Sequence, residues 1–123
     1  MQIALIPADP SLDITFHDVE RGQGYLGALQ ELVSGDIQAV TLQRYAMTMY
    51  LNENGKLEGL PANHRATVLA HWAEAVRSDD IIAGDVVLTG PIDSAGEDTP
   101  IVDNHKWWLL RFDDEQTESS ATS

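Results

Sequence analysis

Two short apolar segments in the middle of the chain constrain the fold more than any other feature. The first is IQAVTLQ (Ile37–Gln43) and the second is AMTMYLN (Ala46–Asn52), and only Arg44 and Tyr45 separate them. Both are rich in β-branched or large apolar residues, which favour strands. A connection this short joins strands that lie side by side and antiparallel. The sequence therefore predicts a β-hairpin.

Further strands are expected on both sides of this hairpin. Ile3–Asp9 is mostly apolar and ends at prolines, whereas Leu12–Val19 alternates apolar and polar residues and predicts a strand with one wet face. Asp85–Thr89 is bounded by glycines, and Lys56–Leu60 is expected to form a short strand after an Asn-Gly turn. Lys106–Phe112 is apolar on both faces when read as a strand, which is typical of a covered position in a sheet.

Two segments carry apolar residues at helical spacing. We expect one helix over about Gly24–Ser34, and a second that begins at an Asn63 N-cap and ends near Arg77, with Trp72 in the core. The order of elements predicts an α+β fold with a mixed, mainly antiparallel sheet of about five to six strands and two helices packed on one face.

The length of 123 residues fits one domain, expected over residues 1–112. The remaining segment, residues 113–123, is acidic, rich in Ser and Thr and poor in apolar residues, so we expect it to be a disordered tail. No signal peptide or membrane-spanning run is found, and there is no cysteine. These features lead us to expect a cytoplasmic protein without disulfides.

The chain is strongly acidic, with a formal net charge of −13. Removing the four acidic residues of the tail from this total leaves −9 for the expected domain. Such a charge repels nucleic acids and anionic membranes and attracts basic protein surfaces. The expected partner is therefore a protein with a basic surface, with no direct nucleic-acid binding and no membrane contact; high solubility alone is the alternative explanation.

One motif matches a dinucleotide-binding pattern, but its surroundings do not fit. GQGYLG (Gly22–Gly27) has the G-x-G-x-x-G spacing between a predicted strand and a predicted helix. The preceding strand has a wet face, no acidic residue stands about twenty positions later, and a hairpin follows in place of a βαβ unit. We interpret the glycines as a flexible entry to the helix and expect no dinucleotide cofactor.

Catalytic and metal-binding patterns are also missing from the sequence. His64 and His71 are seven residues apart on one predicted helix, about 10 Å, which is too far for two ligands of a single metal ion. No G-x-S-x-G elbow is present. We expect no catalytic residues, no metal and no cofactor.

Two groups of residues are candidates for binding. The start of the Asn63 helix offers backbone amides to an anion, assisted by His64 and Arg65, with the strand end at Gly84 and Asp85 as a second wall. On the last predicted strand Trp107 and Trp108 point in opposite directions, which leaves two alternatives: both are covered, or one is less buried. An exposed tryptophan would anchor a basic partner, together with the acidic pair Asp79 and Asp80.

Three stretches together resemble a small uncharacterised family found in phages of actinobacteria, in plasmids and in conjugative elements. They are LQELVSGDIQAVTL (Leu29–Leu42), MYLNENGKLEGLPANHRAT (Met49–Thr67) and DDIIAGDVVLTG (Asp79–Gly90). The family has no activity that the resemblance could transfer. It implies a small accessory protein of a mobile element, acting in a bacterial cytoplasm.

Two functional hypotheses follow. The first is an accessory protein that binds, and thereby inhibits, a host protein, with mimicry of DNA by its carboxylates as a sharper version. The second is a small-molecule or nucleotide-binding protein with its anion site at the Asn63 helix N-terminus. The sequence does not predict an oligomeric state.

Overall fold

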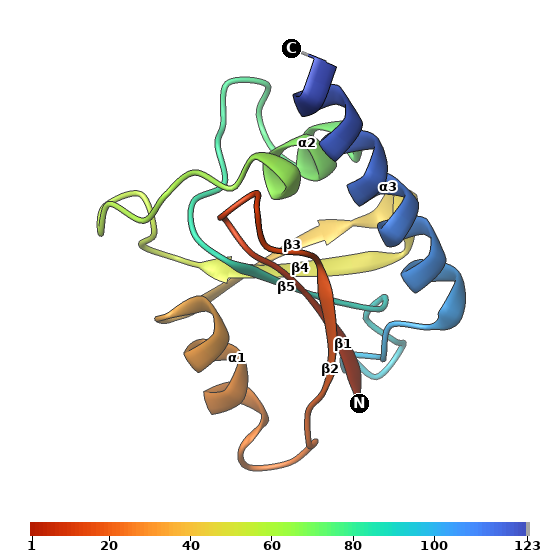
Figure 1. Cartoon of the computed structure of the whole chain (residues 1–123). Helices are drawn as coiled ribbons and strands as arrows, with labels where there is room; N and C mark the ends of the chain where they lie inside the picture. Colours follow the sequence, from red (N-terminus) through yellow and green to blue (C-terminus); the bar gives the residue numbers. More distant parts are fainter. Residues whose placement is uncertain (123) are drawn as a thin grey trace.

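A five-stranded antiparallel sheet forms the middle layer of the molecule (Figure 1). The computed structural model describes residues 1–122 and their side chains as far as Gln116, so Ser123 lies outside the described part. The expected α+β class is confirmed, and because every strand pairing is antiparallel the sheet is antiparallel throughout and not mixed. The strands, in the spatial order β2-β1-β5-β4-β3, are β2 (Thr15–Asp18), β1 (Gln2–Ile6), β5 (Val86–Thr89), β4 (Met47–Asn52) and β3 (Ile37–Leu42).

The sheet consists of two hairpins joined by β5. The predicted central hairpin is confirmed: β3 pairs with β4 in a register that sets Val40 opposite Met49, and a short 3₁₀ turn, η1 (Gln43–Tyr45), connects them. The first two strands form a second antiparallel pair at the other side. Between the hairpins, Leu88 of β5 pairs with Ala4 on one side and with Met49 on the other. The two hairpins are therefore joined into one open sheet only by β5, which comes much later in the chain than β1.

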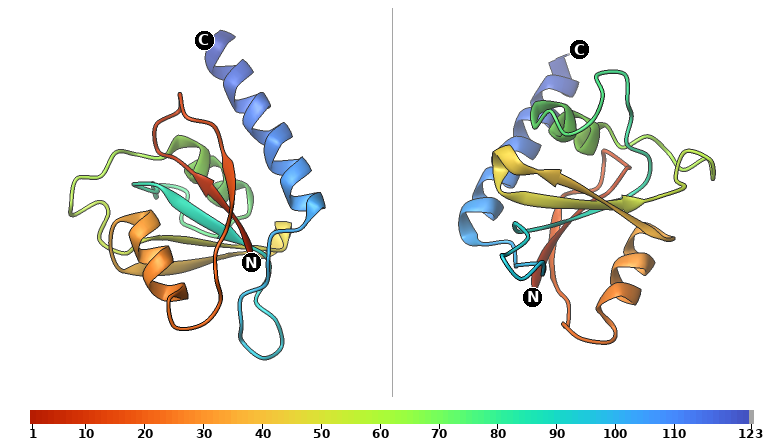
Figure 2. Two further views of the ribbon diagram at one scale, coloured as in Figure 1. Left: turned by 60° about the horizontal axis from the view of Figure 1, so that its bottom comes forward. Right: turned by 180° about the vertical axis from the view of Figure 1, so that it is seen from behind.

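Helices cover both faces of the sheet, not one face as predicted. Helix α1 (Tyr25–Val33) packs on one face, and α2 (His64–Trp72) and α3 (Asp103–Thr122) lie over the other, as the views in Figure 2 show. The physical reason lies in β4, whose side chains are buried on both faces. Met47 and Met49 belong to the core below α2 and α3, whereas Tyr50 belongs to the core below α1.

The predicted final strand, Lys106–Phe112, is wrong, because this segment is part of α3. Leu109 and Phe112 face the core three positions apart, and Asp113 is also buried, which is the spacing of one helix face. Asp103 lies in the first turn, where a carboxylate is favourable near the positive end of the helix dipole. The helix continues past the expected domain boundary at residue 112, so Asp113 belongs to the folded domain and not to a disordered tail.

Two smaller predictions are also corrected. Lys56–Leu60 is not a strand but a series of tight turns, in which Leu60 N–H donates to the Gly55 carbonyl at 2.9 Å. Helix α2 ends at Trp72 and not near Arg77, since Glu74 adopts a positive φ of 54° that no α-helix accommodates. At this helix end Trp72 is 43% exposed and only partly contributes to the core.

Candidate functional site

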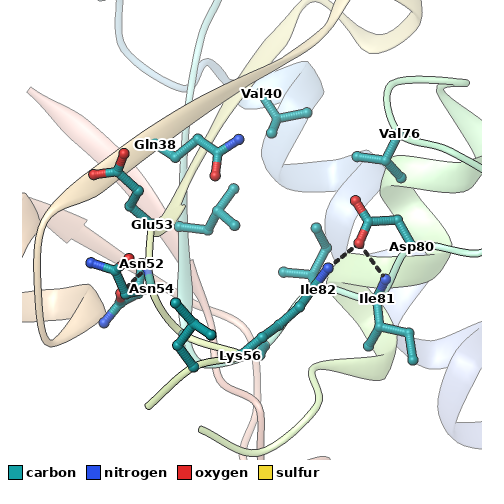
Figure 3. Close-up of a pocket in the computed structure, with 14 residues that line it drawn as sticks. Gln38, Val40, Asn52, Glu53, Asn54, Lys56, Val76, Asp80, Ile81 and Ile82 are labelled. Carbon is teal, nitrogen blue, oxygen red and sulfur yellow. Dashed lines mark hydrogen bonds and ion pairs between the residues drawn. The ribbon is translucent and has the colours of Figure 1, made fainter. Parts of the chain in front are cut away.

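A groove runs along the outer side of β3 and is the main candidate site of the fold; Figure 3 shows its deepest part. Its deepest part is a cavity of about 270 Å³. This cavity lies between β3, the C-terminal end of β4 with the turn after it, and the segment that connects α2 to β5. A shallower hollow with which it shares Gln38, Val40, Val76 and Asp80 extends it along β3. We call the two together the β3 groove; its walls are residues 38–41 on one side, residues 74–77 and 80–83 on the other, and residues 51–57 at the end.

The floor of the β3 groove is apolar and its rim is charged. Leu51 and Ile82 are almost fully buried at its base, and Val40 is half-buried beside them. Lys56 reaches across the mouth and forms an ion pair with Asp80, drawn as a dashed line in Figure 3. The hydrogen bond from Lys56 lowers the pKa of the Asp80 carboxyl. This arrangement suits a ligand with apolar side groups and polar or charged ends.

A second cavity, of about 390 Å³, lies near the N-terminus beside Tyr25 and Tyr50. Both phenol groups donate hydrogen bonds of 2.5 Å to the carboxylate of Asp98, one to each oxygen. Burial raises the pKa of both tyrosines above the usual range, and the hydrogen bond to the Asp98 carboxylate raises it further. The three side chains satisfy one another and fasten the loop before α3 to α1 and β4, so their first role is structural.

Asn63, expected at an anion site, is fully buried and caps α2. Its side-chain oxygen accepts a hydrogen bond of 3.0 Å from Ala66 N–H, which confirms the predicted N-cap. Its side-chain nitrogen donates to the carbonyls of Ile6 and Gly84 at 2.9 and 3.0 Å. Asn63 therefore fastens the start of α2 to the C-terminal end of β1 and to the segment before β5.

Arg65, the predicted cationic partner of an anion, is also buried. Its guanidinium forms an ion pair with Asp113 at 2.9 Å and donates to backbone carbonyls in the connection between β1 and β2. A side chain held in this way is not presented to a ligand. The carbonyls that it bonds are those of Pro7, Asp9 and Leu12.

The other predicted ligand residues do not converge on a cavity. His64 is exposed. Gly84, at a φ of 86°, donates its N–H to the Pro61 carbonyl, and Asp85 accepts a hydrogen bond from Ala8 N–H. The turn after β4 lines the β3 groove, and its neighbours there are residues 80–83, not Gly84 and Asp85. The anion-binding hypothesis stays a prediction.

The two predicted aromatic anchors have different environments. Trp107 is 63% exposed on the outer face of α3, and the guanidinium of Arg111 lies 5.1 Å from the centre of its ring. Trp108 is turned inward and stacks between Tyr45 and Phe112, with ring centres 4.6 and 5.5 Å away. Of the two alternatives that the sequence left open, the structure has the one with an exposed tryptophan, although the element is a helix and not a strand.

Of the acidic pair, Asp80 lines the β3 groove and Asp79 is next to it in the chain, so both lie on a different element from the tryptophans. Asp79 is exposed and forms an ion pair of 3.3 Å with Arg77, while Asp80 is half-buried and bonded to Lys56. The two predicted halves of the partner-binding surface, tryptophans and carboxylates, are thus carried by α3 and by the segment after α2.

Residues 1–112 match the model of a family described as "Domain of unknown function (DUF3846)". This match covers nearly the whole chain, including all of β1 to β5 and the first half of α3. The chain belongs to the DUF3846 family. The resemblance to an uncharacterised family that the sequence motifs indicate is thereby confirmed. No curated protein and no solved structure matches the chain.

Within the described part of this DUF3846 protein, no helix is both long enough and apolar enough to cross a membrane. The family match ends at residue 112, whereas the buried ion-pair partner of Arg65 is residue 113. The folded unit of this chain thus extends beyond the matched residues by at least the next turn of α3.

Sequence reasoning missed most of the β3 groove of the DUF3846 domain. Gln38, Val40 and Val76 line it, yet none carries a chemical signature. The usable signal is that IQAVTL contains neither charge nor proline, which is unusual for a strand at the edge of a sheet. That signal has meaning only once the strand order is known.

Proposed function

We propose that this DUF3846 protein acts by binding a partner protein with a basic surface. The observation that carries the proposal is the exposure of Trp107 on the outer face of α3. Tryptophan is the residue type most enriched among the anchors of protein interfaces, because its large ring buries much surface at little entropic cost. Leu110, one turn further along the same face, is also about half exposed.

The charge of the chain supports a basic partner. The formal net charge is −13, and among the described acidic residues only Asp80, Asp85, Asp98 and Asp113 are not exposed. On α3 itself Asp103 and Asp114 flank the aromatic anchor. Although Arg111 lies over the Trp107 ring, the negative charge of the chain as a whole steers a basic surface toward the protein and favours it over other partners.

Binding accounts for the perturbed groups better than catalysis does. The pKa of Asp80 is lowered because Lys56 donates a hydrogen bond to its carboxylate. The pKa values of Tyr25 and Tyr50 are raised by burial and by the nearby carboxylate of Asp98. Each of these groups is engaged with another residue of the chain, as expected for structural contacts.

The finer parts of the proposal have different support. Mimicry of DNA needs carboxylates gathered on one face, whereas Glu31 on α1 and Asp114 on α3 are exposed on opposite sides of the sheet. We therefore propose recognition of a basic protein surface without DNA mimicry. The further proposal of an accessory protein of a phage or plasmid that inhibits a host protein in the bacterial cytoplasm is supported by the sequence resemblance alone.

The test is capture of partners from a bacterial lysate on the immobilised protein, followed by elution with salt. A basic protein should bind the wild type and elute as ionic strength rises. Trp107→Ala should weaken its binding by about thirtyfold, the effect of losing an interface anchor. Leu26→Ala is the matched control, because Leu26 is also an exposed large apolar residue but lies on α1 at the other face.

Two results would contradict the proposal. One is a captured partner whose retention ignores both salt and the Trp107 substitution. The other is the absence of any captured basic protein, with the immobilised protein shown to be folded.

A further inference from the structure

The outer edge of β3 is open. This strand is last in the sheet order, and across the described residues its backbone hydrogen bonds are made with β4 alone. Gln38, Ala39 and Thr41 are exposed there. A strand of six residues in this position presents a row of backbone donors and acceptors to solvent.

The register shows which backbone groups point outward. Glu53 N–H donates to the Asp36 carbonyl at 2.8 Å, so this pair is of the hydrogen-bonded kind. Bonded and non-bonded pairs alternate along an antiparallel ladder. The N–H and C=O groups of Ile37, Ala39 and Thr41 therefore point away from β4, toward the free edge.

β3 lacks the features with which proteins protect an edge strand. Its sequence, IQAVTL, has no lysine, no proline and no charged residue, and its register with β4 contains no bulge. The opposite edge differs: β2 has four residues, and its Asp18 is paired with the N-terminal ammonium group. One edge of the sheet is thus short and charged, and the other is long and neutral.

The β3 groove lies beside this open edge and is acidic. Its two cationic side chains, Lys56 and Arg77, are paired with Asp80 and Asp79. Glu53 and Glu74 also lie on the rim and are exposed, so the rim is negative overall. A strand added to β3 would direct alternate side chains over Val40 and Val76, between these carboxylates.

We propose that β3 receives an extended, basic segment of the partner protein, which adds to the sheet as a sixth strand. Backbone bonds to Ile37, Ala39 and Thr41 would supply the affinity, and apolar and cationic side chains alternating in the β3 groove would supply the specificity. The inference rests on the proposed function, since it names the part of the partner that binds. A second copy of the chain is disfavoured, because two molecules of charge −13 repel each other.

The test uses a ten-residue peptide of alternating lysine and valine with both ends blocked. In the free protein the amides of Ala39 and Thr41 should exchange with solvent rapidly, because they point outward. Saturation with the peptide should slow both at least about tenfold, as amides entering a hydrogen-bonded ladder become protected. The amides of Gln38 and Val40, already bonded to β4, should change little.

Variants and altered peptides separate edge pairing from charge attraction. Ala39→Pro removes one outward N–H without removing a bond to β4, and should weaken peptide binding by about tenfold or more. Ala39→Val keeps the N–H and is the matched control. Because Ala39→Pro can also disturb the strand, a peptide with N-methyl groups on alternate residues tests edge pairing on the intact protein. It cannot donate to the outward carbonyls of Ile37, Ala39 and Thr41, and should also bind at least about tenfold more weakly. A glutamate-valine peptide should not bind.

Several results would overturn the inference. They are protection on α3 in place of β3, equal binding of the glutamate peptide, equal binding of the N-methylated peptide, or protected Ala39 and Thr41 amides in a self-associated protein without peptide. A lysate partner that depends on Trp107 but binds Ala39→Pro as well as Ala39→Val would reject the edge site and leave the proposed function standing. Peptide binding at β3 without any Trp107-dependent partner would keep the edge site and reject the proposed function as argued from Trp107.

Discussion

Arg65 and Asp113 form a buried ion pair, with 2.9 Å between Nη1 and Oδ1, that joins the start of α2 to the middle of α3. The other side of the guanidinium donates to three backbone carbonyls of the β1–β2 connection, and the second carboxylate oxygen of Asp113 lies 3.5 Å from Ile14 N–H. One pair of side chains thus holds two helices and a loop together. Removing either partner leaves the other charge buried, which is costly.

The first prediction concerns the length of the domain. A chain ending at Phe112 lacks Asp113, leaves Arg65 unpaired, and should lose about 3–5 kcal/mol of unfolding free energy. A chain ending at Gln116 keeps the pair and is the control. Urea denaturation followed by circular dichroism measures both. Equal midpoints for the two chains would show that the ion pair contributes nothing.

The second prediction separates the two roles of Asn63. Asn63→Ala should lower the unfolding free energy by about 3 kcal/mol, since it removes the cap and two buried hydrogen bonds. Asn63→Asp keeps the capping oxygen but turns a carboxylate toward the carbonyls of Ile6 and Gly84, so it should be no more stable than the alanine variant. If the aspartate variant is as stable as wild type, capping is the only role that matters.

The third prediction compares two glycines. Gly27 lies inside α1 and an added Cβ there would meet nothing within 4 Å, so Gly27→Ala should stabilise the protein by about 0.5–1 kcal/mol. At Gly90 a Cβ would approach the Pro100 carbonyl to 2.5 Å, and Gly90→Ala should destabilise it by about 1–3 kcal/mol. Thermal denaturation of the two variants tests the opposite signs; a shift in the same direction for both would be inconsistent with this packing.

The fourth prediction is a pH dependence at His105. Burial lowers the pKa of this imidazole below its usual value of 6.5, and Nδ1 accepts a hydrogen bond of 3.1 Å from Val102 N–H, which requires the neutral ring. The unfolded chain therefore binds a proton more readily, so stability falls as the pH drops below 6.5 toward the folded-state pKa. His105→Gln should show a shallower fall between pH 7 and about pH 5. Urea denaturation as a function of pH measures the difference, and identical profiles for the His105 variant and wild type would refute it.

The elements predicted well from sequence are those defined by local chemistry. The central hairpin follows from the short separation in sequence between its two apolar segments, and the start of α2 follows from the capping side chain of Asn63. Both depend on residues close in the sequence. The exposure of Trp107 was open in the sequence, because the argument about the tryptophan pair used a strand where the structure has a helix.

The prediction failed where a pattern fits two periods. In the run from Trp107 to Phe112 every second residue and every third or fourth residue is apolar, so the run fits a strand and a helix alike. Asp113 would have decided between them, because it continues the inward face of a helix, but an acidic residue there is buried only because Arg65 meets it. That partner is distant in the sequence. The open edge of β3 could not be predicted either, because the strand order depends on where β5, which is distant in the sequence, inserts into the sheet.

The position of β5 also affects how the protein folds. Its pairing with β1, through Leu88 and Ala4, brings together residues from opposite ends of the fold, whereas each hairpin uses only nearby residues. Contacts between distant residues form slowly because a long loop must close first. During synthesis on the ribosome, both hairpins can therefore appear before the centre of the sheet exists, and until Thr89 has emerged β1 and β4 each carry an unpaired inner edge. The nascent chain should be most prone to aggregation in that interval.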